Sequence, residues 1–385
     1  MNKILIIPLC CSLCFNLSCI EVRDKSKSET SQEVAVDSLY IIDLQQTTRS
    51  EQSPSINDLA QDIRFINLEF QKESALSTIN FRADKIDDKL IVSSLNSPVM
   101  QFDTLGRYEK SVITFGRERA ELRRSIYKST LNNGELTYNQ GYKTIALTTN
   151  SKMGYISQRY YFGVVSLSGG EYVALPNMGL KLLDDDTHLD FLDSNFNCLK
   201  SVKHLNSEDL YYDVPQGYSG RLESCALSPS KSGGALFRMI FSDTVFLITD
   251  KDTIEPYIKL KYGKLMPEIK NITDQNKIHL KSITENNNYI LINYGYQSSA
   301  YTIIWDKRSG TTVSNCKIDY ADNNSLINST YFTDYTTPNG DQIKVGIAGI
   351  SSDTLYCVVK TDDAVNFMDN MSVEDNPLVL EIKLK

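Results

Sequence analysis

The sequence predicts an all-β protein of the β-propeller class, and three observations support this prediction. Short runs rich in Val, Ile, Tyr, Phe and Thr fill the 385-residue chain, whereas helical periodicity is scarce. One type of hairpin recurs at the spacing of a propeller blade. Strand-like runs also stand near both ends of the chain, where together they can close a ring and cover its exposed sheet edges.

The strand-like runs are short, and clusters of polar turn residues separate them. They occupy residues 38–44, 63–70, 89–95, 98–103, 143–149, 160–167, 170–175, 244–250, 289–296, 301–306, 354–360 and 377–385. Short β-branched and aromatic runs between turn signals are typical of all-β folds. The apolar content of 41% is sufficient for a packed core.

The stretch QFDTLGRYEKSV, residues 101–112, defines the recurring hairpin. An apolar strand ends on Asp103, a short polar turn containing a glycine follows, and a second strand begins. The same layout surrounds Asp193, Asp250 and Asp306, which lie 90, 57 and 56 residues further along in turn. Asp and Gly suit such turns because of their local hydrogen bonds and conformational freedom. The charged residues of this stretch are therefore expected to be solvated or to lie between blades.

The gap of 90 residues is long enough for one more hairpin. We expect it within residues 143–158, with Asn150 and Gly154 as the turn residues. The spacing then becomes about 45–57 residues, the length of a four-stranded antiparallel blade. A β-sandwich shows turns every 8–12 residues without this longer period. The spacing therefore favours a propeller.

Residues 89–122, KLIVSSLNSPVMQFDTLGRYEKSVITFGRERAEL, resemble a known family. They are similar to the first blade of the TolB-like, six-bladed β-propeller lipoproteins that are abundant in Bacteroidetes. Residues 241–264 and 376–385 look like that family's blade endings. The resemblance implies six blades, each a four-stranded antiparallel sheet. It supplies neither catalytic residues nor a cofactor.

The charged loop at the end of this segment departs from the family pattern. It keeps Gly116, Arg117 and Glu121 but has Glu-Arg-Ala at 118–120 where the family has Gly-Pro-Gly. Arg117 and Arg119 are candidate contacts for an anion or an acidic sugar, because a guanidinium binds carboxylates in a bidentate manner. The alternative is a structural turn in which Glu121 pairs with the arginines.

The N-terminus predicts export and a lipid anchor. Lys3 is followed by an almost uncharged run over 4–18, which is too short to span a bilayer but fits a secretory signal. Cys19 directly follows this run and resembles the lipidated cysteine of bacterial lipoproteins, although Asn16 stands where an aliphatic residue is usual. An ordinary signal peptide is the alternative. A lipidated protein is attached to the membrane without crossing it.

These signals divide the chain into three parts. Residues 1–18 are expected to be a lipoprotein signal peptide, 19–36 a polar tether, and 37–385 a single propeller. The C-terminal run and one of the two early runs, 38–44 or 63–70, are expected to close the ring in the last blade. The predicted location is the outer membrane, on its periplasmic or its surface side.

Composition limits the function classes. The net charge of -8 argues against nucleic-acid binding, which needs a clustered basic surface. Cysteines 198, 225, 316 and 357 follow no metal-binding spacing and are expected to be buried thiols, with disulfide pairing as the alternative. His188, His204 and His279 show no ligand spacing, and the acidic run at 184–186 does not match a calcium loop. We therefore expect no metal and no cofactor.

Tyrosine supplies the remaining binding candidates, with 22 residues against one tryptophan. Tyr211, Tyr212 and Tyr218 lie in a loop that also contains Pro and Gly, where exposed rings can stack on a sugar or anchor a protein. The predicted function is non-covalent recognition of a protein or glycan at the cell envelope. A propeller-fold polysaccharide lyase or glycosidase is the first alternative, and a scaffold subunit of an envelope complex is the second.

Overall fold

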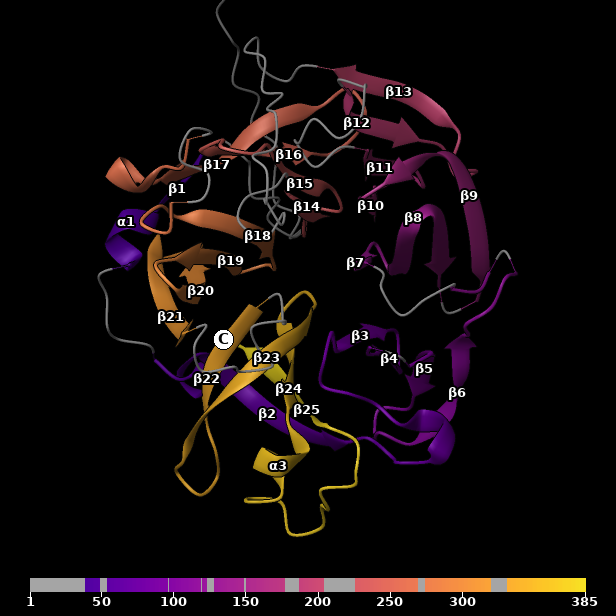
Figure 1. Ribbon diagram of the computed structural model, residues 1–385, viewed down its shortest axis with the longest axis vertical. Helices are drawn as coiled ribbons and strands as arrows, with labels where there is room; N and C mark the ends of the chain where they lie inside the picture. The colour runs from indigo at the N-terminus through magenta and orange to yellow at the C-terminus, as the bar shows by residue number, and fades with distance from the viewer. Residues whose placement is uncertain are drawn as a thin grey trace, which may run out of the picture. The chain divides into compact units, whose positions relative to one another are not determined.

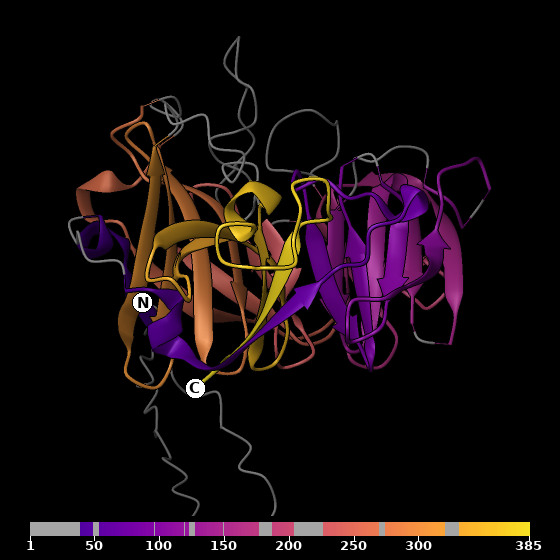
Figure 2. The ribbon, with the colours of Figure 1, turned by 90° about the horizontal axis from the view of Figure 1, so that it is seen from below.

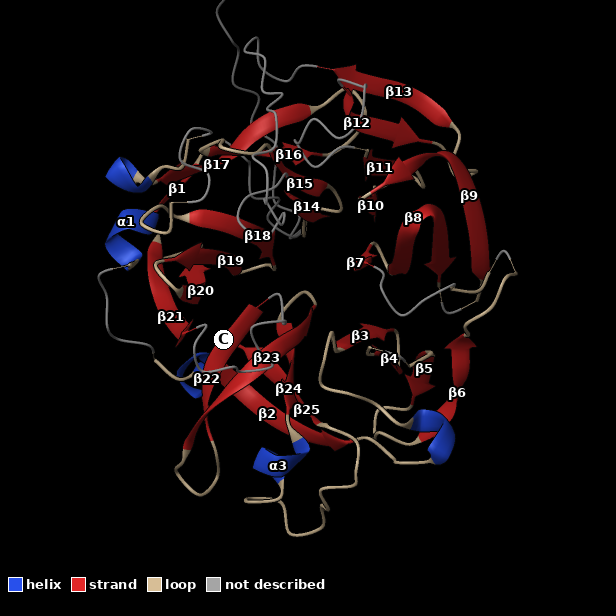
Figure 3. Cartoon of the chain, in the orientation of Figure 1, coloured by secondary structure: helices blue, strands red, loops and turns tan. Residues whose placement is uncertain are grey.

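The computed structural model describes residues 39–48, 54–95, 97–118, 120–122, 128–148, 150–176, 187–203, 226–268, 274–319 and 331–385. They belong to one compact unit, Ser38–Lys385. Six small sheets of this unit surround a common axis, so the unit is a six-bladed β-propeller (Figure 1). Strands dominate it, and the helices are single turns (Figure 3). The predicted fold class is confirmed.

The first three blades follow one another along the chain. Blade 1 contains β3 (Arg82–Ile86), β4 (Lys89–Ser93), β5 (Val99–Phe102) and β6 (Tyr108–Ile113). Blade 2 contains β7 (Lys128–Asn132), β8 (Glu135–Leu147) and β9 (Lys152–Tyr161). Blade 3 contains β10 (Gly163–Ser166), β11 (Tyr172–Leu175), β12 (Thr187–Leu192) and β13 (Cys198–Lys203). Neighbouring strands within each of these blades are antiparallel.

The other three blades complete the ring. Blade 4 contains β14 (Ala226–Pro229), β15 (Ala235–Arg238), β16 (Thr244–Ile248) and β17 (Ile254–Lys261). Blade 5 contains β18 (His279–Glu285), β19 (Tyr289–Tyr296), β20 (Ser299–Asp306) and β21 (Thr311–Asp319). Blade 6 contains β22 (Tyr331–Thr336), β23 (Gln342–Ile350), β24 (Thr354–Val359) and β25 (Leu378–Leu384). Strands β3, β7, β10, β14, β18 and β23 lie nearest the axis, and β22 extends from β23 towards blade 5 (Figure 1).

The ring is closed by strands from the two ends of the described chain. Strand β2 (Ala60–Asn67) pairs antiparallel with β25 and becomes the outer strand of blade 6 (Figure 2). The expected clasp is therefore confirmed for the run at 63–70. The other early run forms β1 (Tyr40–Asp43), which instead pairs with β17 of blade 4, and does so in parallel. The two early strands thus extend different blades.

Strand β1 and the segment that follows it connect blades 4, 5 and 6. It contains the one-turn helices α1 (Leu44–Thr47) and α2 (Ile56–Leu59). The Thr47 carbonyl accepts a 2.7 Å hydrogen bond from the Asn315 amide of blade 5, and the Asn57 amide donates to the Thr336 carbonyl of blade 6 at 2.9 Å. The other helices among the described residues are α3 (Thr361–Ala364) and the 3₁₀ turns η1 (Lys72–Ser74) and η2 (Gly263–Leu265).

The four recurring aspartates cap equivalent turns, each between the third and fourth strand of a blade. The Oδ1 atom of Asp103 accepts from the backbone N–H groups of Leu105 and Arg107, both at 2.9 Å. Asp193 accepts two such bonds, and Asp250 and Asp306 each accept from the residue two positions further on. These bonds are the Asx turns that the hairpin pattern predicted.

Blade 2 differs from the predicted hairpin in two respects. Its turn covers residues 148–151 and so includes Asn150, whereas Gly154 lies within β9 and pairs with Ile145. The expectation that Gly154 marks the turn was wrong, because the strand continues through it. The described part of blade 2 also has three strands, since the long β8 pairs first with β7 and then with β9.

The core consists of apolar layers between adjacent blades. Buried polar contacts also join adjacent blades. One cluster joins Val245 and Ile258 of blade 4 to Ile290 and Ile303 of blade 5. At the junction of blades 2 and 3, the buried Asp190 accepts from Arg159 Nη1 at 2.9 Å, among other donors. Such pairing offsets the cost of burying a carboxylate. The blade junctions are therefore fixed by both packing and charge.

The described cysteines are free thiols. Cys316 and Cys357 are buried, as expected, but Cys198 is exposed at the start of β13. The prediction of a buried Cys198 was wrong because it lies on the outer strand of its blade. Cys225 lies outside the described residues. Every helix in the described residues is too short to cross a membrane.

Candidate functional site: a polar pocket on the propeller axis

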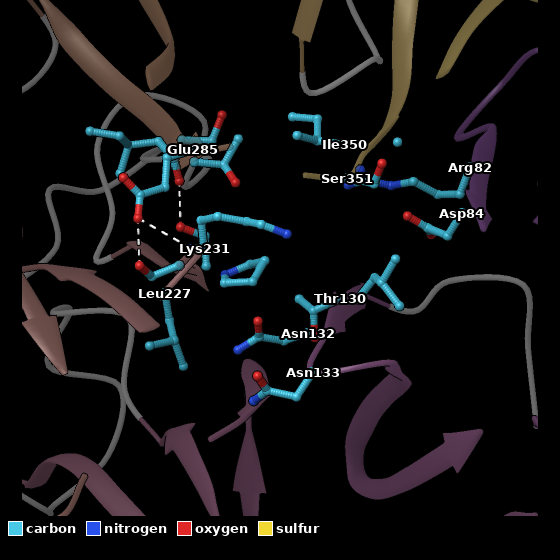
Figure 4. Close-up of a pocket in the computed structure, with 18 of the residues that line it drawn as sticks. Arg82, Asp84, Thr130, Asn132, Asn133, Leu227, Lys231, Glu285, Ile350 and Ser351 are labelled. Carbon is cyan, nitrogen blue, oxygen red and sulfur yellow. Dashed lines mark hydrogen bonds between the residues drawn. The ribbon is translucent and has the colours of Figure 1, made fainter. Parts of the chain in front are cut away.

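A pocket of about 500 Å³ lies where the inner strands of several blades converge (Figure 4). Its wall comes from β3, from the turns that follow β7 and β14, from β18, and from the end of β23 with the turn that follows it. This volume is in the range of small-molecule sites. Because distant parts of the chain meet here, the pocket exists only in the closed ring.

One side of the pocket contains a fully engaged carboxylate, Glu285 at the end of β18. Lys307 Nζ lies 2.6 Å from its Oε2 atom, and the Tyr257 hydroxyl donates to the same oxygen at 3.0 Å. The Ser230 hydroxyl and the backbone N–H of Lys231 donate to Oε1. Burial beside this charge raises the pKa of the Tyr257 phenol, which stays protonated and remains a donor. Glu285 thus joins blade 4 to blade 5.

The opposite side contains a carboxyl in a very different state, Asp84 in the middle of β3. Asp84 is only 8% exposed, yet its side chain makes no hydrogen bond or ion pair within the described chain. Burial raises the pKa of Asp84 to about 6, and the nearby Arg82 charge opposes this rise. Burying a carboxyl that accepts no hydrogen bonds lowers the free energy of unfolding. Asp84 is therefore the strongest candidate in the pocket for contact with a ligand.

Lys231 faces Asp84 across the pocket. It lies in the β14–β15 turn, and its side chain extends into the cavity from the side opposite Asp84 (Figure 4). Burial lowers the pKa of Lys231 below its ordinary value; the charge of Asp353 opposes this effect and that of Lys307 adds to it. In the described chain the ammonium group of Lys231 has neither an ion pair nor a hydrogen bond. Asp84 and Lys231 thus face one cavity without pairing with each other, on a wall that also contains the charged residues Arg82, Lys85, Asp87 and Lys281.

The rest of the wall is mixed in character. Amide and hydroxyl groups come from Asn132, Asn133, Ser351 and others, and the two amides also cross-link the blades by donating to backbone carbonyls. The apolar part of the wall consists of Ile86, Leu131, Phe162, Leu175, Ala226, Leu227, Ile283 and Ile350. A few placed polar groups on an apolar wall are typical of ligand sites.

The residues proposed from sequence do not line this pocket where the structure describes them. Arg117 is exposed in the loop after β6, where Glu121 accepts a hydrogen bond from the backbone of Glu118 rather than forming an ion pair with Arg117. Arg119, Tyr211, Tyr212 and Tyr218 lie outside the described residues, as do Cys19 and the acidic run at 184–186. Their predicted roles remain predictions.

The histidines give no site in the part of the chain that the structure describes. His279 is buried, and its Nε2 atom lies 2.8 Å from the Asp274 carbonyl oxygen. The side chains of His188 and His204 lie outside the described residues. No group of three or more metal-binding side chains occurs among the residues described.

Sequence reasoning missed the pocket residues, although a weak signal was present. Asp84 interrupts the short strand RADKI, and Lys231 follows a strand that ends on Pro229. Charges in or beside short inner strands would have marked both positions, but the order of strands around the axis was needed to bring them together.

Comparison with known proteins assigns the chain to a family. The model of a domain of unknown function, DUF4934, matches residues 39–383. The chain belongs to the DUF4934 family. No curated protein sequence matches it.

Solved structures agree on the fold. A protein from Bacteroides fragilis that is classed as exported superimposes with a TM-score of 0.61 at 11% identity, covering 90% of this chain and 100% of that one. A catalytically inactive virginiamycin B lyase of Staphylococcus aureus gives a TM-score of only 0.40 at 9% identity, covering 84% and 100% of the two chains. At 11% identity the likeness of the DUF4934 chain to the first structure concerns the fold alone, and at a TM-score of 0.40 the second carries no argument.

Proposed function

We propose that this DUF4934 protein is an exported, lipid-anchored β-propeller that recognises a protein or glycan at the cell envelope through its axial pocket. The observation that carries the proposal is the pair Asp84 and Lys231, two charges that face one cavity and remain unpaired within the described chain. Buried charges without partners persist at a cost to stability and are typical of functional sites.

The state of the carboxyls favours binding over glycosidase chemistry. Glycosidases of the common type use two carboxyl groups, one as acid and one as nucleophile or base. In this pocket Glu285 is occupied by Lys307, Tyr257 and Ser230. Asp84 is thus the carboxyl to which the described residues offer no donor. Asp87, the third carboxyl of the wall, is exposed in the β3–β4 turn, so Asp84 is the buried carboxyl without donors, and this arrangement suits recognition of a ligand better than a paired acid–base mechanism.

The proposed location is supported by the N-terminal sequence. The apolar run before Cys19 and the polar stretch after it support export and lipidation, on the outer membrane and in the manner of the TolB-like lipoproteins of Bacteroidetes that the blade sequences resemble. A protein held in this way keeps its propeller close to the membrane surface, where envelope proteins and glycans are concentrated.

The anchor is tested by metabolic labelling with a fatty-acid analogue. We expect the wild-type chain to be labelled and Cys19→Ala to be unlabelled and released from the membrane fraction. Cys14→Ala is the matched control because this cysteine lies within the predicted signal peptide. Equal labelling of Cys19→Ala and wild type would exclude this lipidation site.

Recognition is tested with the full-length protein on peptide and glycan arrays. We expect a set of ligands whose binding is lost in Lys231→Glu and kept in Lys89→Glu, which changes a lysine on the surface of blade 1. Ligands that bind the Lys231 variant as well as the wild type would show that recognition takes place away from the axis. Failure to bind any array component would contradict a role in recognising peptides or glycans.

A further inference from the structure

We infer that the axial pocket selects a zwitterionic ligand, one that carries a cationic amine and an anionic group on a small apolar body, such as an amino acid or a short peptide. This inference rests on the proposed binding function and specifies its ligand class. Asp84 accepts hydrogen bonds from the amine, and Lys231 donates to the anionic group.

An occupied pocket must balance the charges on its wall. A ligand excludes water, so each unpaired charge on the wall must then find its counter-charge in the ligand or lose solvation without compensation. A neutral ligand compensates neither Asp84 nor Lys231. An anion alone leaves the Asp84 carboxylate without a partner, and a cation alone leaves Lys231 unpaired. A ligand with both charges satisfies both residues.

The described chain supplies neither Asp84 nor Lys231 with an ion-pair partner. Asp84 and Lys231 form no ion pair with each other, although their side chains extend towards the same space (Figure 4). The nearby carboxylate of Glu285 is fully occupied by Lys307 and other donors, so it does not neutralise the Lys231 ammonium group. Lys231 contributes only its backbone N–H to Glu285, at 3.2 Å. Its ammonium group is thus left for a ligand.

Apolar side chains and a closely packed backbone surround the two charges. Leu227 precedes Lys231 on the same side of the pocket, and Ile350 lies towards the Asp84 side (Figure 4). Gly349 packs tightly beside Asp84, since a Cβ atom at Gly349 would lie 3.1 Å from the Asp84 Oδ1 atom and would clash with the Ala83 carbonyl oxygen at 1.8 Å. The charges thus have apolar neighbours, which suits an aliphatic amino acid or peptide better than a polyhydroxylated ligand.

Calorimetric titration of the full-length protein tests the inference with matched probes. The zwitterionic probes are L-leucine, Leu-Leu and Leu-Leu-Leu, which place the two charges at increasing separation and distinguish a free amino acid from a peptide. N-acetyl-L-leucine lacks the amine, and L-leucinamide lacks the carboxylate; the corresponding capped forms serve for the two peptides. We expect one zwitterionic probe to bind best and each capped form to lose roughly tenfold or more in affinity.

Two variants assign each charge to one residue. Asp84→Asn should abolish the preference for a free amine while keeping the preference for a carboxylate, and Lys231→Gln should do the reverse. Both replacements are close in size, and their melting temperatures establish that they are folded. Equal affinity for free and capped probes, or variants that leave both preferences unchanged, would overturn the inference.

The outcome is separable from the proposed function. If no leucine-based probe binds while array ligands still depend on Lys231, the zwitterion inference is wrong and the binding function stands. If neither these probes nor any array component binds, both are wrong.

Discussion

Two buried carboxyls on opposite sides of one pocket show how this propeller uses charge differently at a blade junction and at its axis. Glu285 sits between blades 4 and 5, where Lys307, Tyr257, Ser230 and a backbone N–H satisfy its two oxygens. Asp84 in blade 1 is almost equally buried but receives no such donors from the described chain. The satisfied carboxylate stabilises the ring, whereas the unsatisfied one destabilises it and is the residue that we propose contacts a ligand.

The largest effect is expected from removing the satisfied carboxylate. Glu285→Ala leaves Lys307, whose side chain is 10% exposed, without its 2.6 Å ion-pair partner and removes the carboxylate to which the Tyr257 hydroxyl donates. We expect the free energy of unfolding to fall by about 4 kcal/mol, measured by chemical denaturation.

The matched control is Glu109→Ala, which removes an ion pair of the same 2.6 Å length between Lys89 and Glu109 on the surface of blade 1. Water solvates both groups there, so the control should change stability little. Similar losses in the two variants would show that burial does not distinguish these pairs.

The second prediction concerns the junction where blade 1 meets β2, the N-terminal strand that closes the ring in blade 6. The Gly106 carbonyl accepts from Glu69 N at 2.8 Å, and a Cβ atom on Gly106 would lie 2.2 Å from the Asn67 carbonyl oxygen. Because the φ angle of Gly106 is +85°, an alanine at this position would also have to adopt an unfavourable backbone conformation. We expect a loss of about 3 kcal/mol in the free energy of unfolding.

Gly134→Ala isolates the backbone part of this effect. Gly134 has φ of +72°, but nothing lies within 4 Å of a Cβ atom built on it. Gly134→Ala should therefore lower the free energy of unfolding by only about 1 kcal/mol. Equal losses would mean that close contact with the clasp contributes nothing, and the QFDTLGRYEKSV hairpin would then serve as an ordinary turn.

The third prediction is a gain in the free energy of unfolding, instead of a loss, when the unsatisfied carboxyl of Asp84 is replaced. The folded-state pKa of Asp84 is raised to about 6 from an ordinary value of 3.8, so between these pH values the folded protein binds more protons than the unfolded chain. The free energy of unfolding therefore falls as pH rises through this window. Asp84→Asn should stabilise the protein by about 2 kcal/mol at pH 7.5 and give no gain near pH 4.

Asp190→Asn is the control for a buried carboxylate that has partners. It loses the ion pair with Arg159, so it should destabilise the protein at pH 7.5. Thermal melts of both variants over pH 4–8 test the contrast. A destabilising Asp84→Asn at neutral pH would mean that Asp84 contributes to the fold in the same way as Asp190 and Glu285.

Local patterns allowed much of the fold to be predicted. Asp103, Asp193, Asp250 and Asp306 each cap a turn within four residues, so their spacing marks the blades before any tertiary contact is known. The clasp was also predictable, because a strand at the C-terminus needs a neighbour and the run at 63–70 was one of two candidates. The sequence did not distinguish β1 from β2, since both are strand-forming and only the packing of blades 4 and 6 separates them.

By itself the sequence determined the strands, their hairpins and the repeat that makes a ring, because these depend on side chains that are neighbours along the chain. The pocket was decided by the tertiary structure alone. Asp84, Lys231 and Glu285 belong to blades 1, 4 and 5, and nothing in their local sequence states which charge will be paired. Ring closure brings Lys307 to Glu285 and leaves Asp84 opposite Lys231. Whether a buried charge stabilises the fold or serves a ligand depends on which donors the closed ring places beside it.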